Sequence, residues 1–341
     1  MKTITRPTMK DVARISGVAE STVSRVINGT KAIGPETRAK VEKALRDLNF
    51  HRDSHARRLA RGRSDFLGLI ISNIENPFYP GLIRSFETAA LASGYEVLLC
   101  TTNYDPVRTD QAFRKMIENK CPGVAVMTSR VDPTMADRLA ERGVASVFLD
   151  GGPPGRLRSN LRLDYAAGAG EAVRALYTLG HRRFALIAGP QNRASHAAYR
   201  RAVEVALKQL RLRVTVIEGN NDAESGATAV TALLTSGELP TAVLCSNDIT
   251  ALGAIRALSQ NGLRVPTDLS VVGADDIPFA ALASPSLSTV HMPREQLGIQ
   301  ALTLLRGMLD HARAPGAECL LSTSLVLRES TGPAPKPGER T

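Results

Sequence analysis

The sequence predicts an α/β protein with two doubly wound parallel sheets, preceded by a small all-α unit. The first fifty residues show helical periodicity alone. Beyond residue 64, eight short apolar runs alternate with longer segments of helical period, which is typical of βαβ units. A break near residue 162 divides these runs into two sets of similar size. At 341 residues and 43% hydrophobic content, the chain is long enough for two or three globular units.

Residues 9–29 predict a helix-turn-helix. Gly17 can adopt the positive φ that a sharp turn requires. Thr8 and Asp11 have the spacing of a capping box at the start of the first helix, and a third helix is expected over 35–49. Each of the first two helices carries an apolar stripe for burial: Val12, Ala13 and Ile15 in the first, and Val23, Val26 and Ile27 in the second.

The positive charge of the chain is concentrated on this unit. Residues 1–63 hold fifteen Lys or Arg against six Asp or Glu, a net charge of +9, whereas the remaining 278 residues have a net charge of +1. Such an asymmetry on a helix-turn-helix is the electrostatic pattern of phosphate binding. We therefore expect double-stranded DNA as a partner.

Several other classes of protein are not supported. There is no charged-then-apolar leader and no run approaching 18 apolar residues, so we expect a cytoplasmic protein that does not bind membranes. Neither G-x-G-x-x-G nor G-x-x-x-x-G-K-[ST] occurs, and we expect neither an enzyme nor a cofactor. The cysteines are far apart and form no C-x-x-C motif, so we expect buried free thiols and no metal site; they are Cys100, Cys121, Cys245 and Cys319.

Several stretches resemble, in order, those of the lactose-repressor (LacI/GalR) family of bacterial transcription regulators. They are the string from Thr8 to Asn28 with the following GPETRAKVEKALRDLNF, ENPFYPGL near Glu75, GHRRFALIAGP from Gly180, LCSNDITALGAIRAL from Leu244, and VPTDLSVVGADDI from Val265 through PSLSTVHMP. The resemblance covers nearly the whole chain. It implies a DNA-binding repressor with a two-lobed, periplasmic-binding-protein-like sensor, in which the chain crosses between the lobes more than once.

The resemblance also implies a domain organisation. The tail lacks apolar periodicity and is expected to be disordered; because it offers no heptad, a homodimer is favoured over a tetramer. The expected parts are a helix-turn-helix headpiece at 1–50, a hinge at 51–63, a first lobe at 64–162 plus 293–324, a second lobe at 163–292 plus 325–331, and the tail at 332–341.

The recognition helix is expected from Glu20 to about Asn28. The start of such a helix and its next turn face the major groove, so we expect Glu20, Ser21 and Arg25 to read base edges. Arg25 can form two hydrogen bonds to guanine, which gives it the largest expected discrimination, about 1–3 kcal/mol. Glu20 has an alternative role, since an acidic residue in a first turn favours the helix dipole. Phosphate contacts are expected from Thr8, Thr22, Ser24 and Asn28.

The basic segment 51–64 resembles the family's hinge, which becomes helical when two subunits meet in the minor groove. Ala56 and Leu59 match the hinge positions, with Leu59 as the apolar wedge that opens a base step. Arg52 and Asp53 stand where the family usually has Pro-Asn, which leaves the start of a hinge helix open. An ordinary basic linker is the alternative.

The resemblance places a small-molecule effector between the lobes, where ligands of open α/β sheets lie beyond the carboxyl ends of the strands. Polar groups at these strand ends suit a hydroxyl-rich ligand such as a sugar or sugar acid. For Asn247 and Asp275, capping of a helix or turn is the alternative role. The matching positions are Asn76, Phe78, Asp150, Arg193, Ser195, Tyr199, Asn247 and Asp275.

Three positions in this predicted pocket depart from the family. Tyr199 stands where an Arg commonly anchors the effector, Ala202 replaces a Gly, and Asn221 replaces the aromatic residue that stacks on a base in purine-binding members. A nucleobase is therefore not the expected effector. Arg200 is one residue along, but helical geometry turns it about 100° away. These departures leave open a regulator that senses no ligand and responds to a protein partner.

Overall fold

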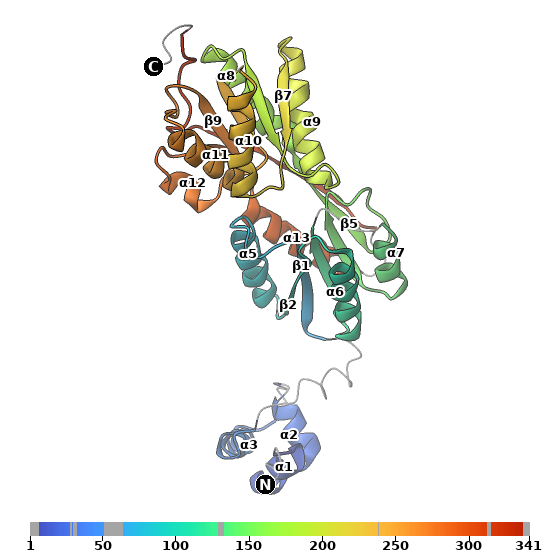
Figure 1. Ribbon diagram of the computed structural model, residues 1–341. Coiled ribbons are helices and arrows are strands. Elements are labelled where there is room, and N and C mark those ends of the chain that lie inside the picture. Colours follow the sequence, from blue (N-terminus) through green and yellow to red (C-terminus); the bar gives the residue numbers. More distant parts are fainter. Residues whose placement is uncertain are drawn as a thin grey trace. The chain divides into compact units, whose positions relative to one another are not determined.

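The computed structural model describes residues 7–27, 29, 33–50, 64–128, 133–237, 239–311 and 315–336. The chain forms two compact units, Met1–Gly62 and Arg63–Thr341, which are drawn in Figure 1. The smaller unit is all helical, and the larger unit contains two six-stranded sheets. The predicted fold class is therefore confirmed.

The smaller unit is a bundle of helices α1 (Met9–Ser16), α2 (Glu20–Ile27) and α3 (Pro35–Asp47). The hydroxyl of Thr8 accepts a hydrogen bond from the backbone N–H of Asp11, whose carboxylate accepts one from the backbone N–H of Thr8. This is the predicted capping box. Gly17 ends α1 with a φ of 70°, the left-handed conformation that the turn requires. The bundle buries Val12, Ala13, Val23, Val26, Val41 and Ala44.

The prediction that Ile15 is buried in this bundle is wrong, because its side chain is 48% exposed. Successive helical residues are turned by about 100°, so Val12, Ala13 and Ser16 lie within one arc of that width and Ile15 falls outside it. Ser16 is buried in the place expected for Ile15. Its hydroxyl donates to the carbonyl oxygen of Val12 over 2.6 Å, which satisfies the polar group inside the bundle.

The first sheet of the larger unit has the strand order β11-β5-β4-β3-β1-β2, and all its pairs are parallel. We call this sheet and its helices the first lobe. Helices α5 and α13 pack on one face of the sheet, and the core of the other face contains side chains of α6 and α7. The strands are β1 (Phe66–Ile71), β2 (Glu96–Thr101), β3 (Gly123–Met127), β4 (Ala145–Leu149), β5 (Arg158–Asp164) and β11 (Glu318–Ser322), and the helices are α5 (Tyr79–Ala92), α6 (Pro106–Glu118), α7 (Pro133–Glu141) and α13 (Arg294–Asp310).

The second sheet has the order β12-β10-β9-β8-β6-β7, and only its β10–β12 pair is antiparallel. This sheet and its helices form the second lobe. Side chains of α8 and α9 pack in the core on one face, and those of α10 and α11 on the other. The strands are β6 (Phe184–Ala188), β7 (Val214–Glu218), β8 (Ala242–Cys245), β9 (Ser270–Asp275), β10 (Ser288–His291) and β12 (Ser324–Val326), and the helices are α8 (Tyr165–Thr178), α9 (Ala194–Gln209), α10 (Ala223–Thr235), α11 (Asp248–Gln260) and α12 (Pro278–Leu282).

The described chain passes between the lobes at three points: from β5 to α8, from β10 to α13, and from β11 to β12. Figure 1 accordingly shows the orange-red α13 among the blue and green elements of the first lobe. Thr323, in the third crossing, donates its hydroxyl hydrogen to the Asp164 carbonyl oxygen and accepts from the Gly168 N–H in the first crossing. The crossings are thus hydrogen-bonded to each other.

The C-terminal segment differs from the expected disordered tail. The backbone N–H of Gly332 donates to Ser270 Oγ over 3.0 Å, and His181 Nε2 lies 3.0 Å from the Gly332 carbonyl oxygen. The Ala334 N–H donates to the carbonyl oxygen of Leu179. The expectation is therefore wrong for 332–336, which lie against the second lobe.

The cysteines are free, as predicted, but only two are fully buried. Cys121 and Cys245 are buried, whereas Cys100 and Cys319 are partly exposed. Among the described residues, no helix is both long and apolar enough to cross a membrane. Nor does any group of three or more His, Cys, Asp or Glu in these ranges have an arrangement that could hold a metal ion.

Candidate functional site

The outer face of α2 carries the three side chains expected to read bases. Val23 and Val26 are buried on the inner face of the helix, whereas Glu20, Ser21 and Arg25 are exposed. Ser21 and Arg25 are four residues apart, so they lie one above the other on the same face of the helix. This face presents a hydroxyl and a guanidinium side by side, a combination suited to base edges.

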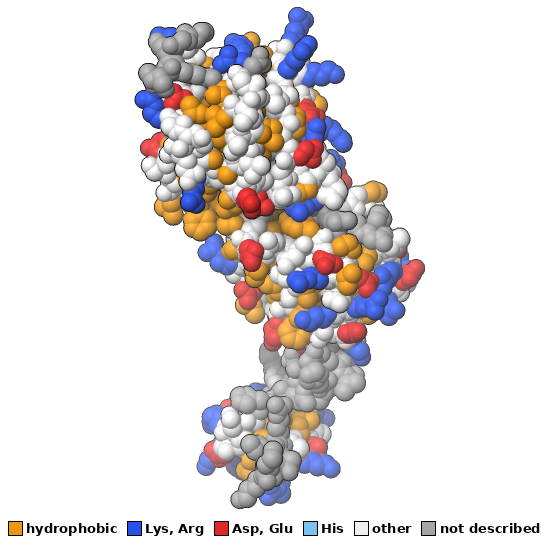
Figure 2. All heavy atoms as spheres, in the orientation of Figure 1, with side chains coloured by type: hydrophobic (Ala, Val, Ile, Leu, Met, Phe, Trp, Pro, Cys, Tyr) orange, Lys and Arg blue, Asp and Glu red, His pale blue; other side chains and the backbone are white. Residues whose placement is uncertain are grey.

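The Arg25 guanidinium makes no ion pair with any of the described residues of its unit. In the described part of the headpiece the ion pairs join Arg14 to Asp11 and Lys40 to Glu36, both on other helices. Figure 2 shows further Lys and Arg side chains at the surface of this unit. Arg25 is therefore available to a partner from outside the chain.

The four expected phosphate contacts have different surroundings. Thr22 and Ser24 are half-buried on α2, and Thr8 is exposed ahead of α1. The Thr8 hydroxyl donates its hydrogen to Asp11 Oδ2 over 2.7 Å, so this donor is already used in the capping box. Asn28 lies outside the described residues, and so does the segment 51–63 with Ala56 and Leu59.

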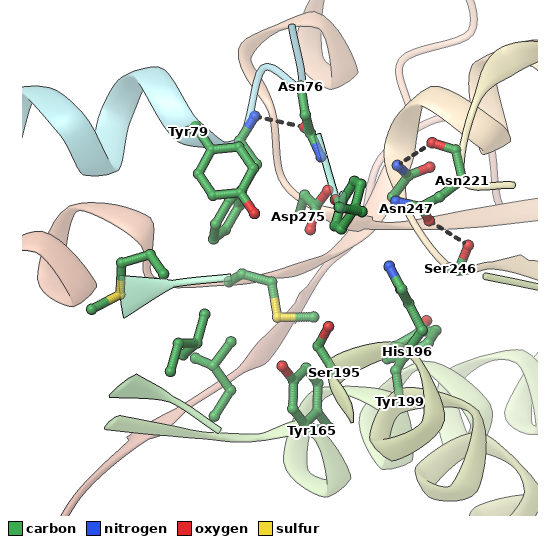
Figure 3. A pocket seen from close by; sticks show the side chains of 16 residues that line it. Asn76, Tyr79, Tyr165, Ser195, His196, Tyr199, Asn221, Ser246, Asn247 and Asp275 are labelled. Carbon is green, nitrogen blue, oxygen red and sulfur yellow. Dashed lines mark hydrogen bonds between the residues drawn. The ribbon is translucent and has the colours of Figure 1, made fainter. Parts of the chain in front are cut away.

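In the larger unit a cavity lies where the carboxyl ends of the two sheets face each other (Figure 3). Its empty space, open mouth and adjoining solvent included, is about 630 Å³. From the first lobe it is lined by Asn76, Phe78, Tyr79, Tyr104, Met127, Leu149 and Leu163. From the second lobe and the crossings it is lined by Tyr165, Ser195, His196, Tyr199, Asn221, Ser246, Asn247, Asp275 and Met292.

Six of the eight positions expected to contact an effector line this one cavity, and two do not. Asp150 lies behind the wall, where it accepts a hydrogen bond from the Tyr165 hydroxyl over 2.8 Å. Arg193 places its guanidinium 3.4 Å from the centre of the Tyr104 ring. Both residues contact a lining tyrosine instead of the cavity itself. The six are Asn76, Phe78, Ser195, Tyr199, Asn247 and Asp275.

Sequence reasoning missed much of the wall and noted Asn221 only as a departure. Tyr79 and His196 adjoin positions that were expected, so proximity to them was an available signal. The buried Met127 and Leu149 end apolar strands, and no pattern separates them from ordinary core residues. The residues missed are Tyr79, Tyr104, Met127, Leu149, Leu163, Tyr165, His196, Ser246 and Met292.

Asn247 has both of the roles that were weighed for it. Its side-chain oxygen caps α11 by accepting from the Thr250 N–H over 2.8 Å, and its Nδ2 donates to the Asn221 carbonyl oxygen. The Ser246 hydroxyl donates to Asn221 Oδ1 over 2.8 Å. Capping and pocket lining are therefore compatible at Asn247, because the same amide side chain fixes the polar corner drawn at the right of Figure 3.

Burial shifts the pKa of several ionisable side chains in the cavity wall. Burial, reinforced by the Arg193 charge, lowers the pKa of His196 to about 4, so its imidazole is neutral at pH 7. Burial, with the neighbouring Asp248 carboxyl, raises the pKa of Asp275 well above its ordinary value. Burial also raises the pKa of Tyr199, which keeps the phenol protonated.

The pKa of the Asp276 carboxyl group, next to Asp275, is shifted in the opposite direction. Hydrogen bonds from His291 Nδ1 and Arg328 Nη2, 2.9 and 2.7 Å away, lower the Asp276 pKa to about 2. Arg294 also donates to the backbone carbonyl oxygens of Asp275 and Asp276. The end of β9 thus combines a paired carboxylate outside the cavity with an unpaired carboxyl that lines it.

Two family models match the chain. Residues 8–53 match "Bacterial regulatory proteins, lacI family", and residues 173–331 match "Periplasmic binding protein-like domain". Among curated relatives, the "HTH-type transcriptional repressor PurR" of Haemophilus influenzae (strain PittEE) is 33% identical over 309 residues, which cover 89% of this chain and 91% of the relative.

Solved structures give the same result. A lac repressor dimer bound to operator and the anti-inducer ONPF is 28% identical, with a TM-score of 0.86 over 96% of this chain and 100% of that one. The complex of the transcriptional regulator CelR with cellobiose is 30% identical, with a TM-score of 0.71 over 95% of this chain and 100% of that one. These proteins match both the headpiece and the two-lobed unit.

Proposed function

Because the chain belongs to the LacI family of bacterial regulatory proteins and is a DNA-binding transcriptional repressor, we propose that a small metabolite bound between its lobes controls its affinity for an operator. The observation that carries this proposal is the cavity at the facing carboxyl ends of the strands. DNA binding by a helix-turn-helix does not itself require such a cavity. The protein would act in the cytoplasm, where bacterial DNA lies.

We propose that α2 enters the major groove and that Glu20, Ser21 and Arg25 read base edges. Exposure of all three on one helix, and the free guanidinium of Arg25, support this assignment. Thr22, Ser24 and Asn28 would contact phosphates. Thr8 is a weaker candidate, because its hydroxyl hydrogen is used by Asp11.

The active assembly in this proposal is a homodimer on a near-palindromic operator. The solved lac repressor complex, described as a dimer on operator, supports this by analogy. In the second lobe, α12 exposes Phe279 by 53% and Leu282 by 79%, and such large apolar side chains are suited to burial against a second copy. Ala56 and Leu59 would then meet in the minor groove at the operator centre.

The proposed effector is a hydroxyl-rich metabolite of the sugar class. Four polar side chains of the wall (Asn76, Ser195, Asn221 and Asn247) are suited to hydroxyl groups. The aromatic side chains beside them suit the apolar faces of a sugar ring. The cellobiose complex of the relative CelR supports the class by analogy.

Selection from a pool of random DNA duplexes with the purified full chain tests the proposal. The expected product is a near-palindromic site whose half-sites are centred about one helical turn, or a multiple of it, apart. Failure to enrich any sequence would contradict operator binding. Titration of the selected site with candidate metabolites then separates a ligand-controlled repressor from one that responds only to a protein partner.

A further inference from the structure

The wall of the cavity contains no fixed positive charge. Of the sixteen described residues that line it, Asp275 is acidic and none is Lys or Arg. His196 does not compensate, because its imidazole is neutral. A negatively charged ligand such as a sugar acid would therefore enter this space without a cation to pair with, at a high cost in desolvation.

The side chain of Asp275 lacks a partner in the described structure. Its backbone oxygen accepts from Arg294, but its carboxyl group makes no hydrogen bond or ion pair with another described residue. Asp275 is half-buried, and a carboxyl group in this situation either keeps its proton or is stabilised as an anion by a cation brought from outside. The charge of Arg294 acts on Asp275 and partly offsets the rise of its pKa, but the Arg294 guanidinium hydrogen-bonds backbone oxygens, and Arg328 binds Asp276.

Aromatic rings surround the same space. The negative face of such a ring attracts a cation, and several rings around one carboxylate are a recurrent site for ammonium groups. The chain already contains one such contact at the wall, between Arg193 and Tyr104. The rings that line the cavity belong to Phe78, Tyr79, Tyr104, Tyr165 and Tyr199.

The Tyr199 hydroxyl places a second chemical requirement on the ligand. Only 3% of Tyr199 is exposed, and its oxygen has no hydrogen-bond partner among the residues that the structure describes. A buried hydroxyl without a partner is costly and uncommon in folded proteins. Because Tyr199 lines the cavity, a hydroxyl or carbonyl group on the ligand would satisfy it (Figure 3).

We propose that the effector is a hydroxylated amine, with its ammonium group next to Asp275 among the aromatic rings and an oxygen within reach of Tyr199. The inference rests on the proposed function, because it assigns a ligand class to the same cavity. It narrows the sugar class to amino sugars and amino alcohols. Sugar acids are disfavoured, because no Lys or Arg is among the described residues that line the cavity and the Arg193 guanidinium is stacked on Tyr104.

The test is calorimetric titration of the full chain at pH 7 with charge-matched ligand sets. Each set contains an amine, its neutral parent and its acid: glucosamine, glucose and glucuronate; galactosamine, galactose and galacturonate; ethanolamine, ethylene glycol and glycolate. The expected result is that at least one amine binds at least tenfold more tightly than its neutral parent, with no binding of the acid. Equal or tighter binding of a parent or acid in every set, or no binding of any amine, would overturn the proposal.

Variants separate the two contacts. Asp275→Asn should remove the preference for the amine over its parent, and Tyr199→Phe should weaken both severalfold while keeping the preference. The matched control is Asp222→Asn, which changes the same chemical group outside the cavity and retains a residue able to cap α10. An amine preference that survives Asp275→Asn would contradict the assignment.

The operator separates failure of this inference from failure of the proposed function. If a neutral sugar binds and changes operator affinity, the hydroxylated amine is wrong and the proposed repressor mechanism stands. If no DNA sequence is selectively bound, the proposed function fails whatever the cavity binds.

Discussion

The hydroxyl of Tyr165 donates a hydrogen bond to the carboxyl group of Asp150 across 2.8 Å, at the first crossing between the lobes. Asp150 directly follows β4 of the first lobe, and Tyr165 is the first residue of α8 in the second. The Tyr165 ring also lines the cavity. A ligand in the cavity would therefore contact a side chain that links the two lobes, which gives a physical route from occupancy to lobe geometry.

Removal of that hydroxyl should weaken the link between the lobes. Tyr165→Phe keeps the ring but leaves the Asp150 carboxyl without this donor, and we expect a loss of about 1–2 kcal/mol in unfolding free energy. Thermal and urea unfolding of the full chain measure it. Tyr177→Phe on the same helix is the matched control. It keeps the ring that stacks with Arg182, so the unfolding free energy of this variant should stay close to that of the wild type. Equal effects of the two variants would show that the Tyr165–Asp150 bond is energetically unimportant.

Replacement of Arg25 should change DNA sequence preference. Arg25→Ala is expected to weaken operator binding by about 1–3 kcal/mol and to relax the preference at one symmetric pair of base positions. Fluorescence anisotropy with single-base operator variants provides the measurement. Lys40→Ala removes a charge from α3 that is already paired with Glu36 and should leave base preference unchanged. A loss that is uniform across all DNA sequences would reassign Arg25 to a phosphate contact.

Operator affinity should fall steeply with salt, because the net charge of +9 on residues 1–63 is doubled in a dimer. Neutralisation of eight or more phosphates predicts a log–log slope of about −7 or steeper. The affinity for the selected operator, measured over a series of salt concentrations, gives this slope directly. A slope shallower than about −3 would mean that most of this charge does not contact DNA.

Stability of the larger unit should depend on the protonation of Asp248. This carboxyl accepts hydrogen bonds from Thr289 Oγ1 and the Ile277 N–H, but burial dominates and raises its pKa to about 7 from an ordinary value of 3.8. The folded state therefore binds this proton more tightly than the unfolded state. The resulting stability is fully present below pH 4 and is lost as the pH rises from 4 to 7.

Comparison with Asp248→Asn isolates this contribution. Over pH 4.5–7.5 the wild-type unfolding free energy should fall relative to that of the variant by on the order of 2–4 kcal/mol. The lowered pKa of Asp276, about 2, acts below this window and does not mask the effect. Parallel pH profiles for the two proteins would contradict the raised pKa.

The sequence predicted the elements whose chemistry is distinctive. The runs that became the inner strands β1, β3, β4, β6, β8 and β9 are mainly apolar because both faces of those strands are buried, whereas the runs of the edge strands β2 and β7 are only partly buried. It did not reveal β5, where the polar residues Arg158, Ser159, Asn160 and Arg162 leave only two apolar positions, Leu161 and Leu163. Nor did it reveal the edge strands β11 and β12, which are five and three residues long and partly exposed. Such strands are specified by their partners in the sheet more than by their own composition.

The cavity was partly predictable for a related reason. Polar residues at the carboxyl ends of strands, such as Asn76, Asn247 and Asp275, stand out in an apolar context. Whether a residue at the start of α9 lines the cavity depends on the direction of its side chain, which the sequence does not specify. Arg193 was therefore expected in the cavity but contacts the Tyr104 ring, and His196 was not expected although it lines the cavity. That the Tyr199 hydroxyl has no hydrogen-bond partner within the described ranges is a tertiary property, because it depends on the side chains that every surrounding element places near it.

Control of DNA binding by the cavity requires that ligand binding and operator binding be thermodynamically linked. Calorimetry gives the dissociation constant of the tightest-binding ligand for the free protein and for the protein saturated with its selected operator. We expect the two constants to differ by about 5- to 150-fold, and the ligand to change operator affinity by the same factor. Tight ligand binding with identical constants in the two states would contradict the claim that this cavity controls DNA binding.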